Sequence, residues 1–210
     1  MDLEFSSEQQ ALREMVRGVV REHAPIEVVR RLENDPQGFP PALWKQLAEL
    51  GVLGVLVPEE YGGAGQTLLE AAIVYEELGR ALAPSPHLPS SVVGAGVLLA
   101  AGSEAQQREW LPKLCDGSAI LTPAWLEPDR GFGPVGVTLR AEADGSGFRL
   151  SGVKRHVPFA SVATRLVVLA RTGRGERDVD LFLVDPNAEG VKLAQQRTIG
   201  SETEHQVELR

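Results

Sequence analysis

The chain has 210 residues, of which 43% are hydrophobic and 24% are charged, a balance that excludes a disordered protein or a collagen-like repeat. Its length allows one or two domains, each with a buried core. A single cysteine excludes a disulfide framework and a multi-cysteine metal cluster, and the four histidines show no ligand spacing. The net charge of −8 argues against a nucleic acid or an anionic membrane as partner.

The sequence shows no targeting or membrane segment. The N-terminus is acidic where a signal peptide has basic residues before an apolar run. The longest uncharged apolar stretch, Val92 to Ala101, is about half of the roughly 20 residues that a membrane span requires. We therefore expect a cytoplasmic protein without a membrane span.

Before residue 120, apolar residues recur at helical spacing. The predicted helices are one through Ala11–Val20 after Ser6 or Ser7, one from Pro40–Pro41 to Gly51, one from Thr67 to Gly79, and two at about 90–101 and 103–114. Ser103 followed by Gln106 is a capping box for the last of them. The adjacent pairs Glu59–Glu60 and Glu76–Glu77 are predicted to be solvated faces and caps, because adjacent helical residues face different directions.

After residue 120 the apolar period shortens to two, which is typical of strands. The predicted strands are Val135–Ala141, Phe148–Ser151, Arg165–Ala170 and Val179–Val184, with turns at Asp144–Gly145, Gly173–Glu176 and Asn187–Gly190. The sequence thus predicts an α+β protein: an all-helical domain of residues 1–119, followed by an antiparallel β-barrel or sandwich domain of residues 120–210.

The last residues, Gln206 to Arg210, are typical of a strand that has just begun. A sheet that ended here would have an unpaired, partly apolar edge, which favours aggregation. This segment is either a natural edge strand or frayed tail, or the point at which a longer protein has been cut. We favour the second interpretation.

No segment of the sequence has the spacing of a catalytic or nucleotide-binding motif. Gly62–Gly65 lacks the third glycine of a dinucleotide fingerprint, and Gly147–Gly152 lacks the lysine spacing of a P-loop, so both are predicted to be turns. Gly145–Gly147 lies in a predicted hairpin turn instead of a nucleophile elbow. Cys115 has no histidine near it in sequence and is predicted to be a half-buried structural residue. The residues alone therefore predict no catalytic constellation.

Several segments in chain order nevertheless match the motifs of one enzyme family. They are Phe39–Gly54, Val57–Gly65, Glu76–Gly79, Gly102–Gln106, Leu111–Gly117, Glu127–Gly131, Leu150–Lys154 and Ala163–Arg171. In this order they resemble the N-terminal helical domain and the middle β domain of the acyl-CoA dehydrogenases. The resemblance covers essentially the whole chain.

This resemblance implies an FAD-dependent oxidoreductase of fatty-acid and lipid metabolism. In the family, FAD lies between the β domain and a C-terminal four-helix domain, and a glutamate removes the α-proton of an acyl-CoA while the flavin accepts the β-hydride. Electrons then pass to an electron-transfer flavoprotein or a similar acceptor. The C-terminal domain, which carries the base, has no counterpart in these residues, so the resemblance assigns no catalytic residue here. It also implies a homo- or hetero-oligomer for the full-length protein.

By the same resemblance, the residues that would bind FAD depart from the family pattern. They are Trp125, Leu126, Glu127, Gly131, Phe132, His156, Val157 and Pro158, and Phe132 would also contact the substrate. Leu126 stands where the family has a threonine whose hydroxyl approaches the flavin, and Phe132 stands where it has a serine. His156 and Pro158 replace the tryptophan and threonine of a Trp-x-Thr motif. At on the order of 1 kcal/mol each, three lost hydrogen bonds would weaken FAD binding about a hundredfold.

Two roles remain open for each of the aromatic rings of His156 and Trp125, and three hypotheses remain open for the function of the chain. His156 would stack or hydrogen-bond in place of the tryptophan, or be an ordinary strand-end residue. Trp125 would stack on the flavin or fill the core, and we favour the core. The chain is either part of an acyl-CoA dehydrogenase, which we favour, or a non-catalytic partner subunit with a degenerate flavin site. A binding module without a redox role is a third hypothesis.

Overall fold

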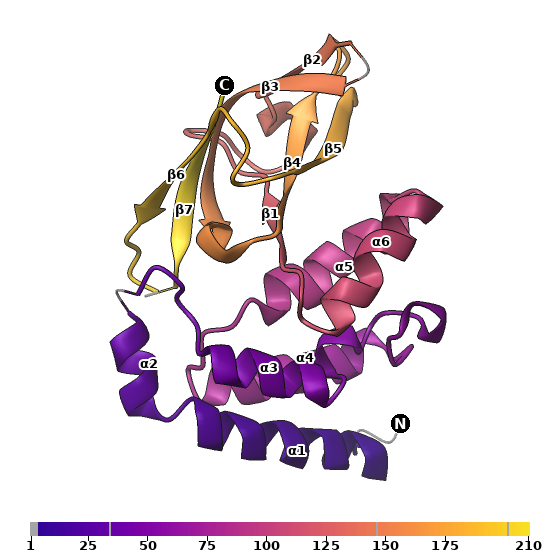
Figure 1. Ribbon diagram of the computed structural model, residues 1–210, viewed down its shortest axis with the longest axis vertical. Coiled ribbons are helices and arrows are strands. Elements are labelled where there is room, and N and C mark those ends of the chain that lie inside the picture. Colours follow the sequence, from indigo (N-terminus) through magenta and orange to yellow (C-terminus); the bar gives the residue numbers. More distant parts are fainter. Residues whose placement is uncertain (1–3, 34, 146, 201) are drawn as a thin grey trace. The chain divides into compact units, whose positions relative to one another are not determined.

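The structure, a computed structural model, describes residues 4–210 except 34, 146 and 201. It forms two compact units, Met1–Ile120 and Leu121–Arg210, the first helical and the second built on a sheet (Figure 1). No helix in the described ranges is long and apolar enough to cross a membrane. Within the same ranges, no three histidine, cysteine, aspartate or glutamate side chains gather as a metal site.

The helical unit consists of short helices joined by tight turns. Its elements are α1 (Ser7–His23), α2 (Ile26–Leu32), α3 (Pro41–Glu49), the 3₁₀ turns η1 (Val52–Gly54) and η2 (Glu59–Tyr61), α4 (Leu68–Arg80), the π-helical turn η3 (His87–Gly94), α5 (Ala95–Ala101) and α6 (Glu104–Cys115). The core of this unit is formed by the apolar faces of α1, α3, α4 and α6.

Cap geometry confirms three of the predicted helix starts. Ser6 caps α1: its Oγ accepts the Gln9 N–H at 3.2 Å, and the Gln9 side chain accepts the Ser6 N–H at 3.0 Å. Ser103 and Gln106 form the same reciprocal pair at α6, and Thr67 caps α4 in the same way. These bonds satisfy N–H groups that a helix start otherwise leaves unpaired.

Three helical regions differ from the prediction. Helix α2 was not predicted; it is only seven residues long, and none of its residues is buried. Helix α4 continues past Gly79 to Arg80. The predicted helix at 90–101 begins earlier, as a π-helical turn from His87, and becomes regular only at Ala95.

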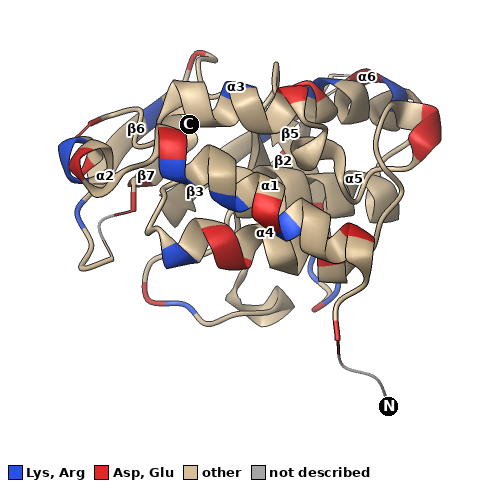
Figure 2. Cartoon of the chain, turned by 90° about the horizontal axis from the view of Figure 1, so that it is seen from below, with Lys and Arg blue, Asp and Glu red and all other residues tan. Residues whose placement is uncertain are grey.

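The prediction that Glu76 and Glu77 are both solvated is wrong for Glu77, whose side chain is 2% exposed. Glu77 accepts hydrogen bonds from Arg13 at 3.1 Å and from Arg17 at 2.9 Å, both on α1. The hydrogen bond from Arg17 is the main reason that the pKa of Glu77 is lowered. Figure 2 shows the charged bands on α1 and α4, which the ion pair between Arg17 and the buried Glu77 joins.

The second unit is one curled sheet of seven strands in the part of the chain that the structure describes. They are β1 (Leu121–Ala124), β2 (Arg140–Asp144), β3 (Gly147–Pro158), β4 (Arg165–Arg171), β5 (Val179–Val184), β6 (Val191–Gln196) and β7 (Glu204–Leu209), with 3₁₀ turns η4 (Pro134–Gly136) and η5 (Ala160–Val162). The predicted order, helices followed by a β domain, is confirmed. The sheet is mixed instead of strictly antiparallel, because β1 pairs with β4 in parallel.

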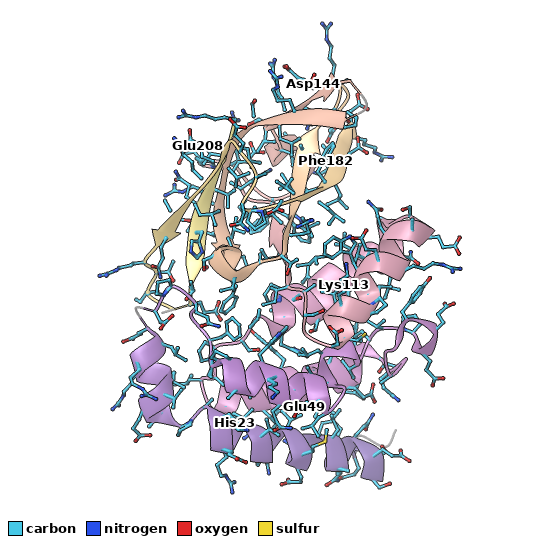
Figure 3. All side chains as sticks on the ribbon, in the orientation of Figure 1. His23, Glu49, Lys113, Asp144, Phe182 and Glu208 are labelled. Atoms are coloured by element: carbon cyan, nitrogen blue, oxygen red, sulfur yellow. The ribbon has the colours of Figure 1, made fainter. Side chains whose placement is uncertain are left out.

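The long strand β3 holds the sheet together. Its first half pairs with β2, and its second half pairs with β7. The change of partner occurs at Gly152, whose φ is 151° and where a Cβ atom would lie 2.8 Å from the side chain of Leu139. The core lies inside the curl and includes Val157, Leu166 and Val207. Figure 3 shows Asp144 at the tip of the β2–β3 hairpin and Phe182 on β5, which packs against this core.

Two strand predictions are corrected by the structure. The strand predicted at Val135–Ala141 begins only at Arg140, because Pro134–Gly136 forms a 3₁₀ turn. The unpaired edge predicted at Gln206–Arg210 is wrong: β7 lies between β3 and β6 and pairs with both. Strand β6 was not predicted, since its alternation of apolar and polar residues is weak.

His87 makes the stability of the helical unit depend on pH. Its ring is 0% exposed, and burial lowers its pKa to about 4. Between that pH and 6.5 the unfolded chain binds a proton that the folded chain does not, so stability falls as the pH falls through this window. Relative to that of wild type, the free energy of unfolding of His87→Leu is expected to be about 2 kcal/mol higher at pH 5 than at pH 7.5. Urea unfolding at both pH values measures this, and an equal difference at both would contradict it.

Candidate functional site

Glu127, in the segment between β1 and β2, is almost fully buried and is the centre of a hydrogen-bond network. Its carboxylate accepts the N–H groups of Thr138 at 2.9 Å and Leu139 at 3.0 Å, and also the Thr138 hydroxyl. The Lys154 ammonium on β3 donates to the same carboxylate at 2.8 Å. Glu127 therefore joins both ends of the 127–139 loop to the central strand.

Lys154 is the charged partner, and its side chain is 0% exposed. It also donates to the Trp125 carbonyl at 3.3 Å. Burial lowers the pKa of Lys154, and burial alone would raise that of Glu127. The hydrogen bonds from Lys154, Thr138 and Leu139 outweigh burial for Glu127 and lower its pKa, so the pair is held charged.

Strand β3 carries a β-bulge at Arg155–His156. Lys154 pairs with Val207 and Val157 pairs with His205, so two residues of β3 face one residue of β7. The bulge frees the Arg155 N–H, which donates to the Leu126 carbonyl at 2.8 Å. It also places His156 in the left-handed region, with φ of 53°. The bulge thus lays the 125–127 segment beside the strand.

Within this bulge, the His156 ring is held by the neighbouring strand. Its Nδ1 lies 2.7 Å from Oε2 of Glu204 on β7, and its backbone N–H donates to the Gln196 side chain at 2.9 Å. The His156 side chain is 46% exposed, so the ring lies at the surface of this unit in one orientation. Its other ring nitrogen has no hydrogen-bond partner among the residues that the structure describes.

The remaining predicted residues divide into exposed and buried groups. Trp125 is 38% exposed and lies outside the core, contrary to the preferred interpretation. Phe132 is 89% exposed, whereas Val157 is a core residue at 1%. Pro158 ends β3, and its carbonyl accepts the Thr122 hydroxyl. The structure therefore brings Trp125, Glu127 and the 154–158 segment together, and leaves Phe132 on the outer part of the loop.

Three residues of this site were missed in the sequence. Thr138, Gln196 and Glu204 all hold predicted site residues in place, yet each lies far from its partner along the chain. A period of two in β7 predicts which side of the sheet Glu204 takes, but not the residue opposite it. Only the pairing of β7 with the bulge reveals the contact.

Whether the site fits a flavin depends on the ring surfaces and hydrogen-bonding groups that its side chains offer. The exposed Trp125 and His156 rings offer flat surfaces and one free imidazole nitrogen to a planar ring system. Leu126, Phe132 and Pro158 offer no side-chain hydrogen bond. The residues present thus offer ring surfaces to a flavin, with fewer side-chain hydrogen bonds than the family pattern has.

Replacing either member of the buried pair leaves a buried charge without a partner. We expect Glu127→Gln and Lys154→Met each to lower the free energy of unfolding by about 3 kcal/mol. The double variant removes both charges and keeps an acceptor for Thr138, so it should lose clearly less than the two single losses together. Denaturant unfolding of the four proteins in a double-mutant cycle measures this coupling. Strictly additive losses would contradict the pairing.

Comparison with known proteins places this chain in a family. The model of the acyl-CoA dehydrogenase N-terminal domain matches residues 6–118, and that of the middle domain matches residues 123–210. The acyl-CoA dehydrogenase FadE27 of Mycobacterium tuberculosis is 34% identical over 95% of this chain and 52% of its own length. The chain thus spans about half the length of the curated relatives it matches.

Solved structures agree with the sequence matches. The ChsE4–ChsE5 complex from Mycobacterium tuberculosis is similar with a TM-score of 0.88 and 32% identity, over 100% of this chain and 56% of that chain. A glutaryl-CoA dehydrogenase from Mycobacterium smegmatis in complex with FADH2 has a TM-score of 0.86 and 26% identity, over 98% and 53%. With family models matched on both units and the same fold in these enzymes, this chain belongs to the acyl-CoA dehydrogenase family.

Proposed function

We propose that the chain is the N-terminal and middle part of an FAD-dependent acyl-CoA dehydrogenase, which forms a double bond between the α and β carbons of an acyl-CoA thioester. The family membership of both units supports the reaction class. The observation that supports the flavin assignment is the network around Glu127, which ties the carbonyl of Trp125, in the loop after β1, to Lys154 in the 154–158 segment of β3. One enzyme of the same fold is described with FADH2.

In this proposal the residues of the chain bind and orient. Trp125 and His156 provide ring surfaces, Glu204 holds the His156 ring, and the backbone of Gly131 and Phe132 provides N–H donors toward the phosphate end. Bound FAD would supply the hydride acceptor that no side chain can provide. We assign the catalytic base to no residue of this chain, and we expect an electron-transfer flavoprotein or a similar protein to accept the electrons.

A second function is favoured by a specific observation, the absence of side-chain hydroxyls at Leu126, Phe132 and Pro158. By this alternative the chain belongs to a non-catalytic subunit that completes a dehydrogenase by contact with a partner. A similar structure is that of a two-protein complex, ChsE4–ChsE5. Both functions place the protein in an oligomer. The enzyme would form a homo-oligomer or a hetero-oligomer, and the partner subunit would form a hetero-oligomer.

Flavin content separates the two functions. We expect the native polypeptide that contains this sequence, purified alone, to carry about one FAD per chain, measured by visible absorbance after denaturation. The subunit alternative expects no bound FAD in the protein alone and FAD in the complex with its partner. Absence of FAD from both preparations would contradict the proposed function.

Restoring the hydroxyl groups tests the site itself. We expect the triple variant Leu126→Thr, Phe132→Ser and Pro158→Thr to bind FAD about a hundredfold more tightly, because three hydrogen bonds are regained. Quenching of FAD fluorescence on titration measures the affinity. Phe148→Ser is the matched control, since Phe148 is an exposed aromatic residue on β3 that packs on Phe182, outside the site. Equal affinities of the triple variant and this control would contradict the assignment.

A further inference from the structure

The two units differ sharply in charge. Residues 1–120 carry the whole acidic excess of the chain, whereas residues 121–210 hold acidic and basic residues in equal number. In the acidic helical unit, six of the nine basic residues lie on α1, α2 and α4, and Figure 2 shows basic residues on α1 and α2. The six are Arg13, Arg17, Arg21, Arg30, Arg31 and Arg80. The cations of this unit are therefore gathered on three helices.

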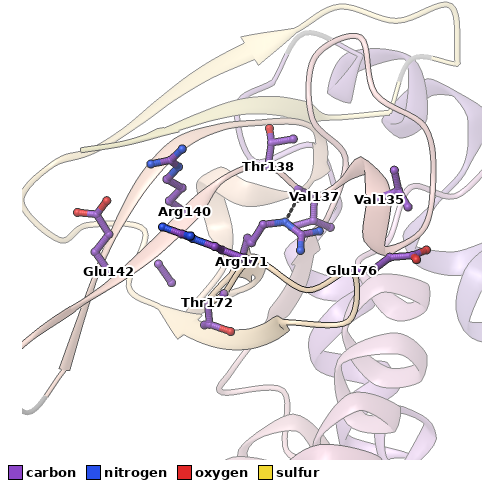
Figure 4. Close-up of a pocket in the computed structure, with 11 residues that line it drawn as sticks. Val135, Val137, Thr138, Arg140, Glu142, Arg171, Thr172 and Glu176 are labelled. Atoms are coloured by element: carbon purple, nitrogen blue, oxygen red, sulfur yellow. Dashed lines mark hydrogen bonds between the residues drawn. The ribbon is translucent and has the colours of Figure 1, made fainter.

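A groove of about 480 Å³ lies among these helices, lined by the C-terminal halves of α1 and α4 and by the start of α2. The buried Val20 lies at its base, and Arg17, Arg21 and Arg80 also line it. In the β unit, by contrast, exposed acidic and basic side chains both face the pocket around Arg171 (Figure 4). The groove of the helical unit thus combines an apolar base with guanidinium groups.

The charge that this groove presents to solvent is positive. Glu77 is the one carboxylate among its described lining residues; the Glu77 side chain is 2% exposed and accepts a hydrogen bond from Arg17 at 2.9 Å. Arg21 is exposed, and within the described residues its guanidinium forms no ion pair or hydrogen bond. An unpaired guanidinium beside an apolar surface is complementary to a carboxylate that stands next to an apolar side chain.

Leu82, which also lines the groove, ends α4 in a conformation that favours glycine. Its φ is 52°, its N–H donates to the Gly79 carbonyl at 3.0 Å, and the Ala83 N–H donates to the Leu78 carbonyl at 2.9 Å. This pair of bonds is a Schellman motif, whose left-handed residue is usually glycine because a Cβ atom is crowded there. The Leu82 side chain is 69% exposed, so packing within the unit does not offset this cost. An exposed apolar side chain kept at a strained position indicates a contact with another molecule.

We propose that the groove and Leu82 form a docking surface for an acidic segment of a partner protein, with an apolar side chain beside its carboxylates. The apolar side chain would cover Val20 and contact Leu82 and Ile26, which is 41% exposed. The carboxylates would pair with Arg21 and its neighbours. A symmetric contact between two copies of this chain would set guanidinium groups against each other, so the charge disfavours a second copy as the occupant.

The probe is a fluorescein-labelled helical peptide of about 15 residues with leucine and glutamate on one face. Fluorescence anisotropy measures its binding to the native polypeptide that contains this sequence. Two matched peptides carry lysine in place of the glutamates or serine in place of the leucines. We expect each of these to bind at least about tenfold more weakly, and binding of the glutamate peptide to weaken as salt rises.

Variants of the protein locate the contact. We expect Leu82→Gly to weaken binding of the glutamate peptide about tenfold and Arg21→Gln to weaken it about threefold. Leu68→Ser is the matched control for Leu82, because Leu68 is also 69% exposed and lies at the start of α4, outside the groove. Lys45→Gln is the control for Arg21, since it removes an exposed cation on α3. Both controls should leave the affinity unchanged.

Stability separates a docking role of Leu82 from a structural one. We expect the urea midpoint of Leu82→Gly to be no lower than that of wild type, because glycine relieves the left-handed strain. A lowered midpoint with unchanged peptide affinity would overturn the proposal, as would equal binding of the glutamate and lysine peptides or no binding of either. Self-association of the native polypeptide that Leu82→Gly abolishes, seen by sedimentation, would also overturn it in favour of a second copy. The FAD content of these variants tests the proposed function separately, because Arg21 and Leu82 lie outside the candidate flavin site.

Discussion

The buried ion pair between Glu127 and Lys154 is the constraint on which the second unit depends. Two charges taken out of water are costly unless each is fully hydrogen-bonded, and here the carboxylate accepts from one ammonium, one hydroxyl and two backbone N–H groups. This geometry ties the loop before β2 to β3. The bulge at Arg155–His156 follows directly after Lys154, so the same strand that anchors the loop also presents the His156 ring.

The sequence predicts most of this fold where the signal is local. The helix starts at Ser6, Thr67 and Ser103 need only a serine or threonine before a segment of helical period, and the structure confirms all three starts. The position of β7 depends on which strands meet across the sheet, which no local period contains. The burial of Glu77 likewise depends on arginines of a distant helix. For the site, the motif residues are found from the resemblance, whereas Glu204 and Thr138 require the folded sheet.

The departures from the family pattern lie at the positions proposed to face a flavin, and the hydrogen-bond network around Glu127 is complete beside them. Leu126, Phe132 and Pro158 offer a ligand no side-chain hydroxyl, whereas Glu127, Lys154 and Gly152 shape the strand and the loop beside it. A scaffold retained around an altered lining is compatible with both proposed functions. In an enzyme, the altered lining would lower the affinity for the cofactor. In a partner subunit, the retained scaffold would preserve the shape that the neighbouring chain contacts.

The partition of charge between the two units has a consequence for handling the protein in solution. The helical unit carries all of the net negative charge, and this charge keeps molecules apart at neutral pH. The β unit, with equal numbers of acidic and basic residues, is close to its isoelectric point under the same conditions. Separated from the helices, it would lose that electrostatic repulsion while Phe132, Val135 and Phe148 remain exposed, and so would tend to self-associate.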